Sequence, residues 1–154
     1  MSSDAYRVPT TAARVKLTLW GGEVHELLLF LATASEIRTG PETLDELLNK
    51  ERGFIAAKSH DGNQSFLVNR RRIVLVDAAA GPAVLLTPEE GSPMGKARVQ
   101  MTTGLIVEGM PLMLAPPGHA RLSDFFNQKE TFLPLAIGPR VTYINKDHVV
   151  SVWL

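Results

Sequence analysis

The stretches LDELLNKERGFIAA (residues 44–57) and LSDFFNQKETFLPL (122–135) carry one pattern of residue types twice. Each stretch runs from a short leucine- or phenylalanine-containing segment through an asparagine and a polar interval to an apolar run. Because copies at a fixed spacing fold as the same structural unit, such a repeat indicates architecture more directly than local propensity does. A shift of 78 positions superposes Leu44 on Leu122, Asn49 on Asn127 and Phe54 on Phe132.

The likeness continues on both sides of these stretches. Downstream, FLVNRRRIVLV (66–76) lies over TYINKDHVVSV (142–152), which places Asn69 on Asn145. A proline- and glycine-punctuated segment separates the two copies, as expected of a linker. We take Arg14-Val15 and Arg98-Val99 as the openings of the copies. The resulting division is a flexible tail 1–12, a first unit 13–77, a linker 78–95 and a second unit 96–154.

Length and composition limit the classes of protein that the chain can belong to. Each copy is near the lower size for independent stability, so we expect the two to share a hydrophobic interface. Sixteen basic and sixteen acidic residues cancel, which argues against nonspecific nucleic-acid binding. The chain has no cysteine, which removes disulfides and thiolate chemistry and fits a reducing cytosol. No apolar run is long enough for a membrane span, and no secretory signal is apparent, so a cytoplasmic protein is expected.

Local patterns predict the same order of elements in each unit: two strands, a short helix and three further strands. In RVKLTLW (14–20) apolar and polar residues alternate, which is the period of a strand with one buried face. Thr43 and Glu46 have the spacing of a capping box, and Asn49 suits a left-handed helix end. Five short strands with one short helix describe a small barrel that leaves few exposed edges. We therefore predict a mostly β protein of two tandem five-stranded small barrels, packed as a pseudo-symmetric pair.

The segment RLSDFFNQ…FLPL…YINKDHVVSV (121–152) resembles uncharacterised bacterial domains with a Sm-like or SH3-like small-barrel core. Their pattern is R-L-S-D-x-L-N, F-L-x-L and I-N-K-x-x-I; the second copy departs from it at Phe126 and Val149. The first copy departs more, with Thr43 and Asp45 at the Arg and Ser positions. The resemblance implies a fold and brings no catalytic residue. The second copy matches at Arg121, Leu122, Ser123, Asp124, Asn127, Phe132, Leu133, Leu135, Ile144, Asn145 and Lys146.

The matched asparagines allow a functional and a structural interpretation. Asn49 and Asn127 end the predicted helices, where an asparagine can face a ligand or cap the helix. Asn69 and Asn145 precede the last strand, where their amides can hold a turn by local hydrogen bonds. The structural interpretation is favoured for all four, because two barrels with different tasks still need the same folding contacts. With Arg121 and Asp124 they form the structural signature of the repeat.

The densest charge on the chain is Arg70-Arg71-Arg72. A Sm-like barrel would present residues of this turn to a nucleotide, and arginine can stack on bases and clamp phosphate. The equivalent positions of the second copy include Lys146 and His148, so this copy is not uniformly basic, and no aromatic platform is evident in the sequence beside the triplet. RNA binding at these five residues is the alternative to a solvated turn or to pairing with an acidic partner surface.

No catalytic or metal-binding constellation is recognisable, and no cofactor is expected. The four histidines, His25, His60, His119 and His148, are scattered and do not have the spacing of a zinc ligand set. No nucleophile elbow or phosphate loop is present.

The apolar strands carry the functional expectation instead. Leu27–Leu31 and 111–114 are apolar on both faces, whereas a small barrel buries only one face of a strand. We expect most of this surface to pack between the two copies and the rest to mediate oligomerisation. The resulting hypothesis is a non-enzymatic interaction, adaptor or assembly module with an unidentified protein partner. RNA or nucleotide binding around Arg70–Arg72 is the alternative.

Overall fold

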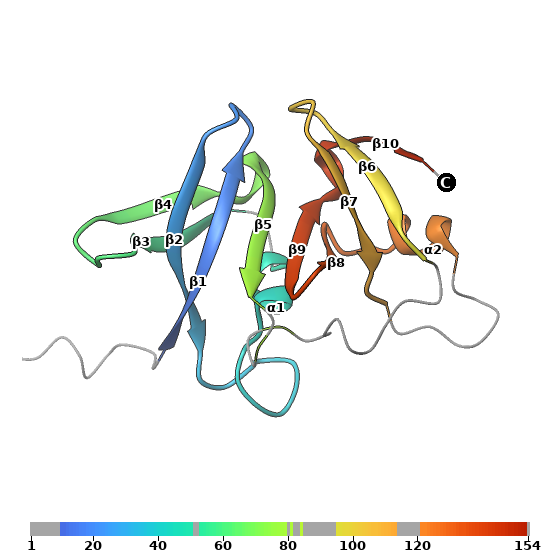
Figure 1. Cartoon of the computed structure of the whole chain (residues 1–154). Helices are drawn as coiled ribbons and strands as arrows, with labels where there is room; N and C mark the ends of the chain where they lie inside the picture. The colour runs from blue at the N-terminus through green and yellow to red at the C-terminus, as the bar shows by residue number, and fades with distance from the viewer. Residues whose placement is uncertain are drawn as a thin grey trace, which may run out of the picture.

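The computed structural model describes residues 10–50, 53–79, 81, 84, 95–113 and 121–153. Within these residues the protein is mostly β, as predicted, with ten antiparallel strands and two five-residue α-helices. The strands are neighbours in the order β10-β6-β7-β8-β9-β5-β1-β2-β3-β4 (Figure 1). The elements of the first unit are β1 (Thr10–Leu19), β2 (Val24–Ala32), α1 (Leu44–Leu48), β3 (Phe54–Ser59), β4 (Ser65–Asn69), a 3-10 turn (Arg70–Arg72) and β5 (Ile73–Ala79). Those of the second unit are β6 (Ala97–Met101), β7 (Ile106–Pro111), α2 (Leu122–Phe126), β8 (Phe132–Ile137), β9 (Arg140–Asn145), a 3-10 turn (Lys146–His148) and β10 (Val149–Trp153).

The two units have one strand order. In the first, β5 pairs with β1 and the meander continues through β2, β3 and β4. In the second, β10 pairs with β6, followed by β7, β8 and β9. The sequence repeat therefore corresponds to a structural repeat.

Equivalent hydrogen bonds fix the alignment of the first strands. The Gly22 N–H donates to Leu19 O at 2.8 Å, and the Gly104 N–H donates to Met101 O at 2.9 Å. Both glycines have a φ of 88°, a backbone conformation that residues with a Cβ atom rarely adopt. These turns are related by a shift of 82 positions, so Leu17 corresponds to Val99. The alignment of Arg14-Val15 with Arg98-Val99 was therefore wrong by two residues.

The barrel prediction is borne out only at the level of a mostly β fold. Among the described residues no ladder joins β4 to β5 or β9 to β10, so the strand order is that of one open sheet. A further difference concerns the expected tail, since β1 already begins at Thr10, which lies opposite Ala32 of β2. Most of the linker 78–95, whose first two residues still belong to β5, and residues 1–9 of the tail lie outside the described residues.

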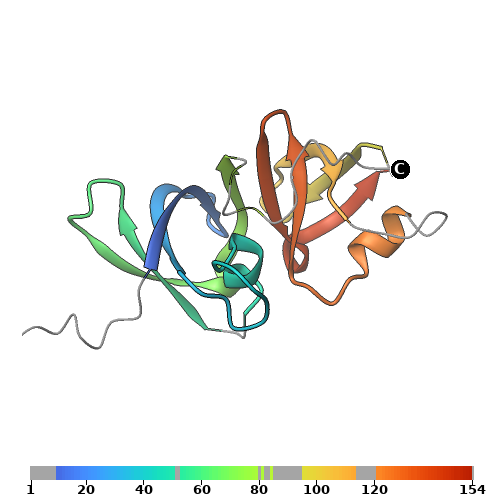
Figure 2. The same ribbon diagram turned by 90° about the horizontal axis from the view of Figure 1, so that it is seen from below.

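The two units meet through β5 and β9, which lie side by side at the centre of Figure 1 and remain adjacent in the view from below (Figure 2). Their antiparallel register runs from Leu75 opposite Ile144 to Ala79 opposite Arg140. β4 and β10 lie at the two ends of the strand order, and among the described residues each has one unpaired edge. The junction is head-to-tail, because the fifth strand of one unit pairs with the fourth strand of the other.

Buried side chains cross the junction in both directions. The core cluster of the first unit includes residues of the second, among them Phe132 and Tyr143, which are 2% and 0% exposed. The core cluster of the second unit includes Val74 and Leu75 of β5. Each hydrophobic core is therefore completed by the other unit. The expected shared interface is present, and Leu112, from the second apolar stretch, is buried in it.

Candidate functional site

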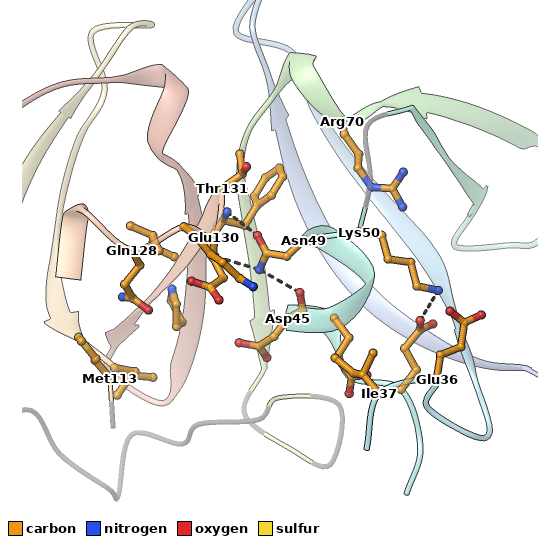
Figure 3. A pocket seen from close by; sticks show the side chains of 17 residues that line it. Glu36, Ile37, Asp45, Asn49, Lys50, Arg70, Met113, Gln128, Glu130 and Thr131 are labelled. Carbon is orange, nitrogen blue, oxygen red and sulfur yellow. Dashed lines mark hydrogen bonds and ion pairs between the residues drawn. The ribbon is translucent and has the colours of Figure 1, made fainter. Parts of the chain in front are cut away.

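A cleft of about 1120 Å³ lies at the junction of the two units. Figure 3 shows α1 on one side of it and the segment Gln128–Thr131 on the other. Five carboxylate side chains line it, together with three cationic ones. The charged lining consists of Glu36, Glu42, Asp45, Glu46 and Glu130 with Lys50, Arg70 and Lys129.

Asn49 joins the two units at the floor of this cleft. Its Nδ2 donates to Phe132 O at 3.2 Å, and its Oδ1 accepts from Phe132 N at 2.8 Å. The side-chain amide thus pairs with the backbone of β8 at a position that the β7–β8 ladder does not reach, as a neighbouring strand would. The same Nδ2 donates to Asp45 O at 2.9 Å, which ties the amide to α1. The left-handed conformation predicted for Asn49 is absent, since its φ is −93°.

Two hydroxyl groups also donate hydrogen bonds across the junction. The Tyr143 hydroxyl donates to Asp45 Oδ1 at 2.8 Å, and the Thr142 hydroxyl donates to Asp77 Oδ1. Burial, followed by the neighbouring Asp45 carboxylate, raises the pKa of the Tyr143 phenol, so this group stays protonated and serves as a donor. The cleft is therefore bounded by an ordered polar seam.

The carboxylates on α1 and before it are also engaged. Glu42 forms an ion pair with Lys50 at 2.5 Å and accepts from Ala32 N at 3.1 Å. Glu46 closes the predicted capping box with Thr43 and accepts from Arg38 Nε at 2.6 Å. Burial alone would raise the pKa of Glu46, but hydrogen bonds from Ser35, Arg38 and Thr43 lower it overall. These groups stabilise the loop before α1 rather than present a free acid or base.

The arginine triplet does not act as one patch. Arg70 is half-buried and its guanidinium donates to Leu47 O at 3.1 Å and to Phe54 O at 3.4 Å. Burial lowers the pKa of Arg70, partly offset by Glu42. Arg71 and Arg72 are exposed, and the guanidinium of Arg72 lies 5.1 Å from the ring centroid of Trp20. An aromatic side chain therefore accompanies the triplet, which the sequence had not revealed because Trp20 lies on a distant turn.

The residues of the second unit that correspond to the arginine triplet and its neighbours have structural roles. Lys146 donates to Gln128 O, and His148 Nε2 lies 2.7 Å from Arg71 O across the junction. Asn145 Oδ1 accepts from Asp147 N at 3.0 Å, while its Nδ2 donates across the junction to Ile73 O at 2.9 Å. Asn69 repeats the local half of this pattern by accepting from Arg71 N at 3.1 Å.

The face of the second unit that corresponds to the seam is not covered by any of the described residues. A hollow of about 390 Å³ lies between α2 and β10 and has an almost wholly apolar lining. Asn127, the counterpart of Asn49, is exposed, and among the described residues its side chain has no hydrogen-bond partner. Arg121 precedes α2 without a side-chain capping bond, and Asp124 is exposed in the first turn. The hollow is lined by Arg121, Leu122, Ser123, Phe126 and Val152.

Large apolar side chains are exposed on the two edge strands and on β3 beside one of them, and the sequence analysis did not identify them. Phe54 and Leu67, on β3 and β4, are 60% and 72% exposed. Val150 and Trp153, on β10, are 60% and 43% exposed. The pattern of each strand alone does not distinguish them from core residues. They are recognised only when the exposed fractions of equivalent positions in the two units are compared.

Comparisons with protein-family models, with curated proteins and with solved structures find no match to this chain. In the part of the chain that the structure describes, neither helix is long and apolar enough to cross a membrane. The same residues contain no group of three or more side chains that could hold a metal ion.

Proposed function

We propose that this protein is a non-enzymatic assembly module that binds protein partners through the two open edges of its sheet. The observation that carries the proposal is the placement of large exposed apolar side chains on unpaired strands at both ends. Leu67 lies on β4 and Val150 on β10. An unpaired strand offers a row of backbone donors and acceptors to another chain.

The state of the polar groups supports a binding role over a catalytic one. In the cleft, Asn49 is held in hydrogen bonds that build the seam, and Glu42 and Glu46 are held in ion pairs that stabilise the loop before α1. An acid–base site would need an available group within reach of a substrate. We further propose that each unit is a small barrel of the SH3-like or Sm-like type, supported by the repeated strand order and the short helix before the third strand.

RNA binding is the second candidate, and the exposed pair Arg72 and Trp20 is the observation that favours it. Arginine and tryptophan supply phosphate contact and base stacking. Arg70 does not contribute, because its guanidinium bonds backbone carbonyls. Fluorescence titration with single-stranded RNA at low salt tests this candidate. Binding that Arg71→Glu with Arg72→Glu abolishes would support it, and no binding to the wild-type chain would end it.

The proposed assembly function is tested in two ways. Light scattering after size exclusion measures the mass of the chain, and immobilisation of the chain shows whether it retains other protein. The wild-type chain is compared with the double variant Leu67→Lys and Val150→Lys. We expect the wild type to bind copies of itself or another protein, and the double variant to lose this binding. A matched control is Ile37→Lys, because Ile37 is 80% exposed but lies in the loop before α1 and on neither edge strand. A wild-type chain that stays monomeric and retains no protein would overturn the proposal.

A further inference from the structure

The internal junction joins two kinds of surface. One is formed by the third strand and the outer edge of the fourth strand of a unit, which in the second unit contribute Phe132 and Tyr143. The other is the groove between the helix and the fifth strand, which in the first unit contributes Leu48, Val76 and Asn49. We call these the strand edge and the groove. The chain contains two of each, and the junction uses only one of each.

The strand edge of the first unit is unpaired. Its Phe54 corresponds to Phe132, yet the exposed fractions are 60% and 2%. Its Leu67 corresponds to Tyr143 by the shift of 76 positions that relates Asn69 to Asn145, and the exposed fractions are 72% and 0%. The positions that are buried in the seam of the second unit therefore carry exposed apolar side chains in the first.

In the part of the chain that the structure describes, nothing fills the groove of the second unit. Its lining residues Leu122, Phe126 and Val152 correspond to Leu44, Leu48 and Val76, which share a buried cluster with Phe132 and Tyr143. Val150 corresponds to Val74, and the exposed fractions are 60% and 0%.

From this reciprocity we infer that the partner is a second copy of this chain, whose strand edge on β3 and β4 docks in the groove between α2 and β10. The inference rests on the assembly function proposed above and names its partner. Continuity with the existing β5–β9 junction defines the geometry, since the new contact repeats it one unit further along the sheet. Phe54 of one copy fills the apolar hollow of the next, and Asn127 pairs with the backbone of that Phe54 as Asn49 pairs with Phe132.

The junction also defines the register. In the β5–β9 ladder Leu75, Val76 and Asp77 lie opposite Ile144, Tyr143 and Thr142. The shift of 76 positions converts this register into pairs between β10 of one copy and β4 of the next. The predicted pairs are Ser151 with Val68, Val152 with Leu67 and Trp153 with Phe66. A shift of one residue would turn the apolar side chains to the opposite face.

The residues that differ between the two contacts agree with this assignment. In the internal seam Thr142 donates a hydrogen bond to Asp77, and the corresponding pair between copies is Phe66 with Trp153. Opposed aromatic residues stabilise an antiparallel pair of strands. The internal contact is thus polar where the external one is aromatic, which disfavours exchange between the two.

A contact between two different surfaces leaves one surface of each kind free at the ends. Addition of copies therefore continues until the assembly closes into a ring, or extends as a filament. An isologous dimer would instead use the same surface on both copies. The two arrangements differ in how edge variants complement each other.

The test uses two single variants, each of which blocks one surface. Leu67→Lys charges the strand edge and Val150→Lys charges the groove side, and both positions are exposed, so each variant should retain the thermal stability of a folded chain. By light scattering we expect the wild type to exceed the mass of one chain and each variant alone to have the mass of one chain. An equimolar mixture should form a 1:1 complex with twice that mass, because one intact strand edge and one intact groove remain.

A wild-type chain that is monomeric would overturn the inference, as would a mixture of the two variants that stays monomeric while the wild type assembles. If the monomeric wild type instead binds another protein, and Leu67→Lys or Val150→Lys abolishes that binding, the proposed assembly function stands and only the second copy is rejected. The control Ile37→Lys should assemble as the wild type does.

Discussion

At the scale of single residues, one side chain joins the two units while its counterpart is free. Asn49 satisfies both the N–H and the C=O of Phe132, whereas Asn127 is exposed. We expect Asn49→Ala to lower the free energy of unfolding by about 2–3 kcal/mol, because two backbone groups lose their partners. Asn127→Ala, in the Val150→Lys background, should change it by less than about 0.5 kcal/mol. Urea denaturation measures both, and equal effects would contradict the role given to Asn49.

A second residue-scale prediction concerns pH. The pKa of Glu46 is lowered in the folded protein, so its contribution to stability is fully present above the ordinary glutamate value of about 4.5 and is lost as the pH falls through the folded pKa. Glu46→Gln should therefore reduce the free energy of unfolding at pH 7, on the order of 1–2 kcal/mol, and reduce it less at pH 3. Denaturation curves at the two pH values would contradict this if the loss were larger in acid.

At the scale of elements, the close approach of β7 and β8 depends on a glycine. A Cβ on Gly109 would lie 2.8 Å from both Ala136 O and Ile137 Cγ1. Because the first of these atoms is backbone, we expect Gly109→Ala to separate the strands and to cost about 1–3 kcal/mol. Gly21→Ala is the control, since nothing lies within 4 Å of its Cβ position. Thermal unfolding that affects the two variants alike would refute the packing argument.

Local sequence patterns were sufficient for most elements. The capping box of Thr43 and Glu46 and the order of strands follow from short-range rules, and both are present. The pairing of β5 with β9 does not follow, because no local pattern specifies which edge meets which. For the same reason the sequence indicated a cap at Asn49 but could not indicate its bond to Phe132, which is 83 residues away.

At the scale of the whole molecule, the repeat has a consequence that neither unit has alone. One strand edge and one groove are combined inside the chain, and one of each remains at its ends. The central claim is that copies combine these remaining surfaces in the register of the internal seam. The chain has no cysteine, so a pair of introduced cysteines reports a single contact without background.

The most direct measurement is disulfide formation between two single-cysteine variants, Val152→Cys and Leu67→Cys, mixed under mild oxidation. The predicted register places these two positions opposite each other, within the short Cα separation that a disulfide requires. We predict rapid formation of the mixed cross-linked dimer, and much less of it when Ile37→Cys replaces Leu67→Cys. Equal cross-linking in the two mixtures, or no cross-linking in either, would contradict the predicted contact between copies.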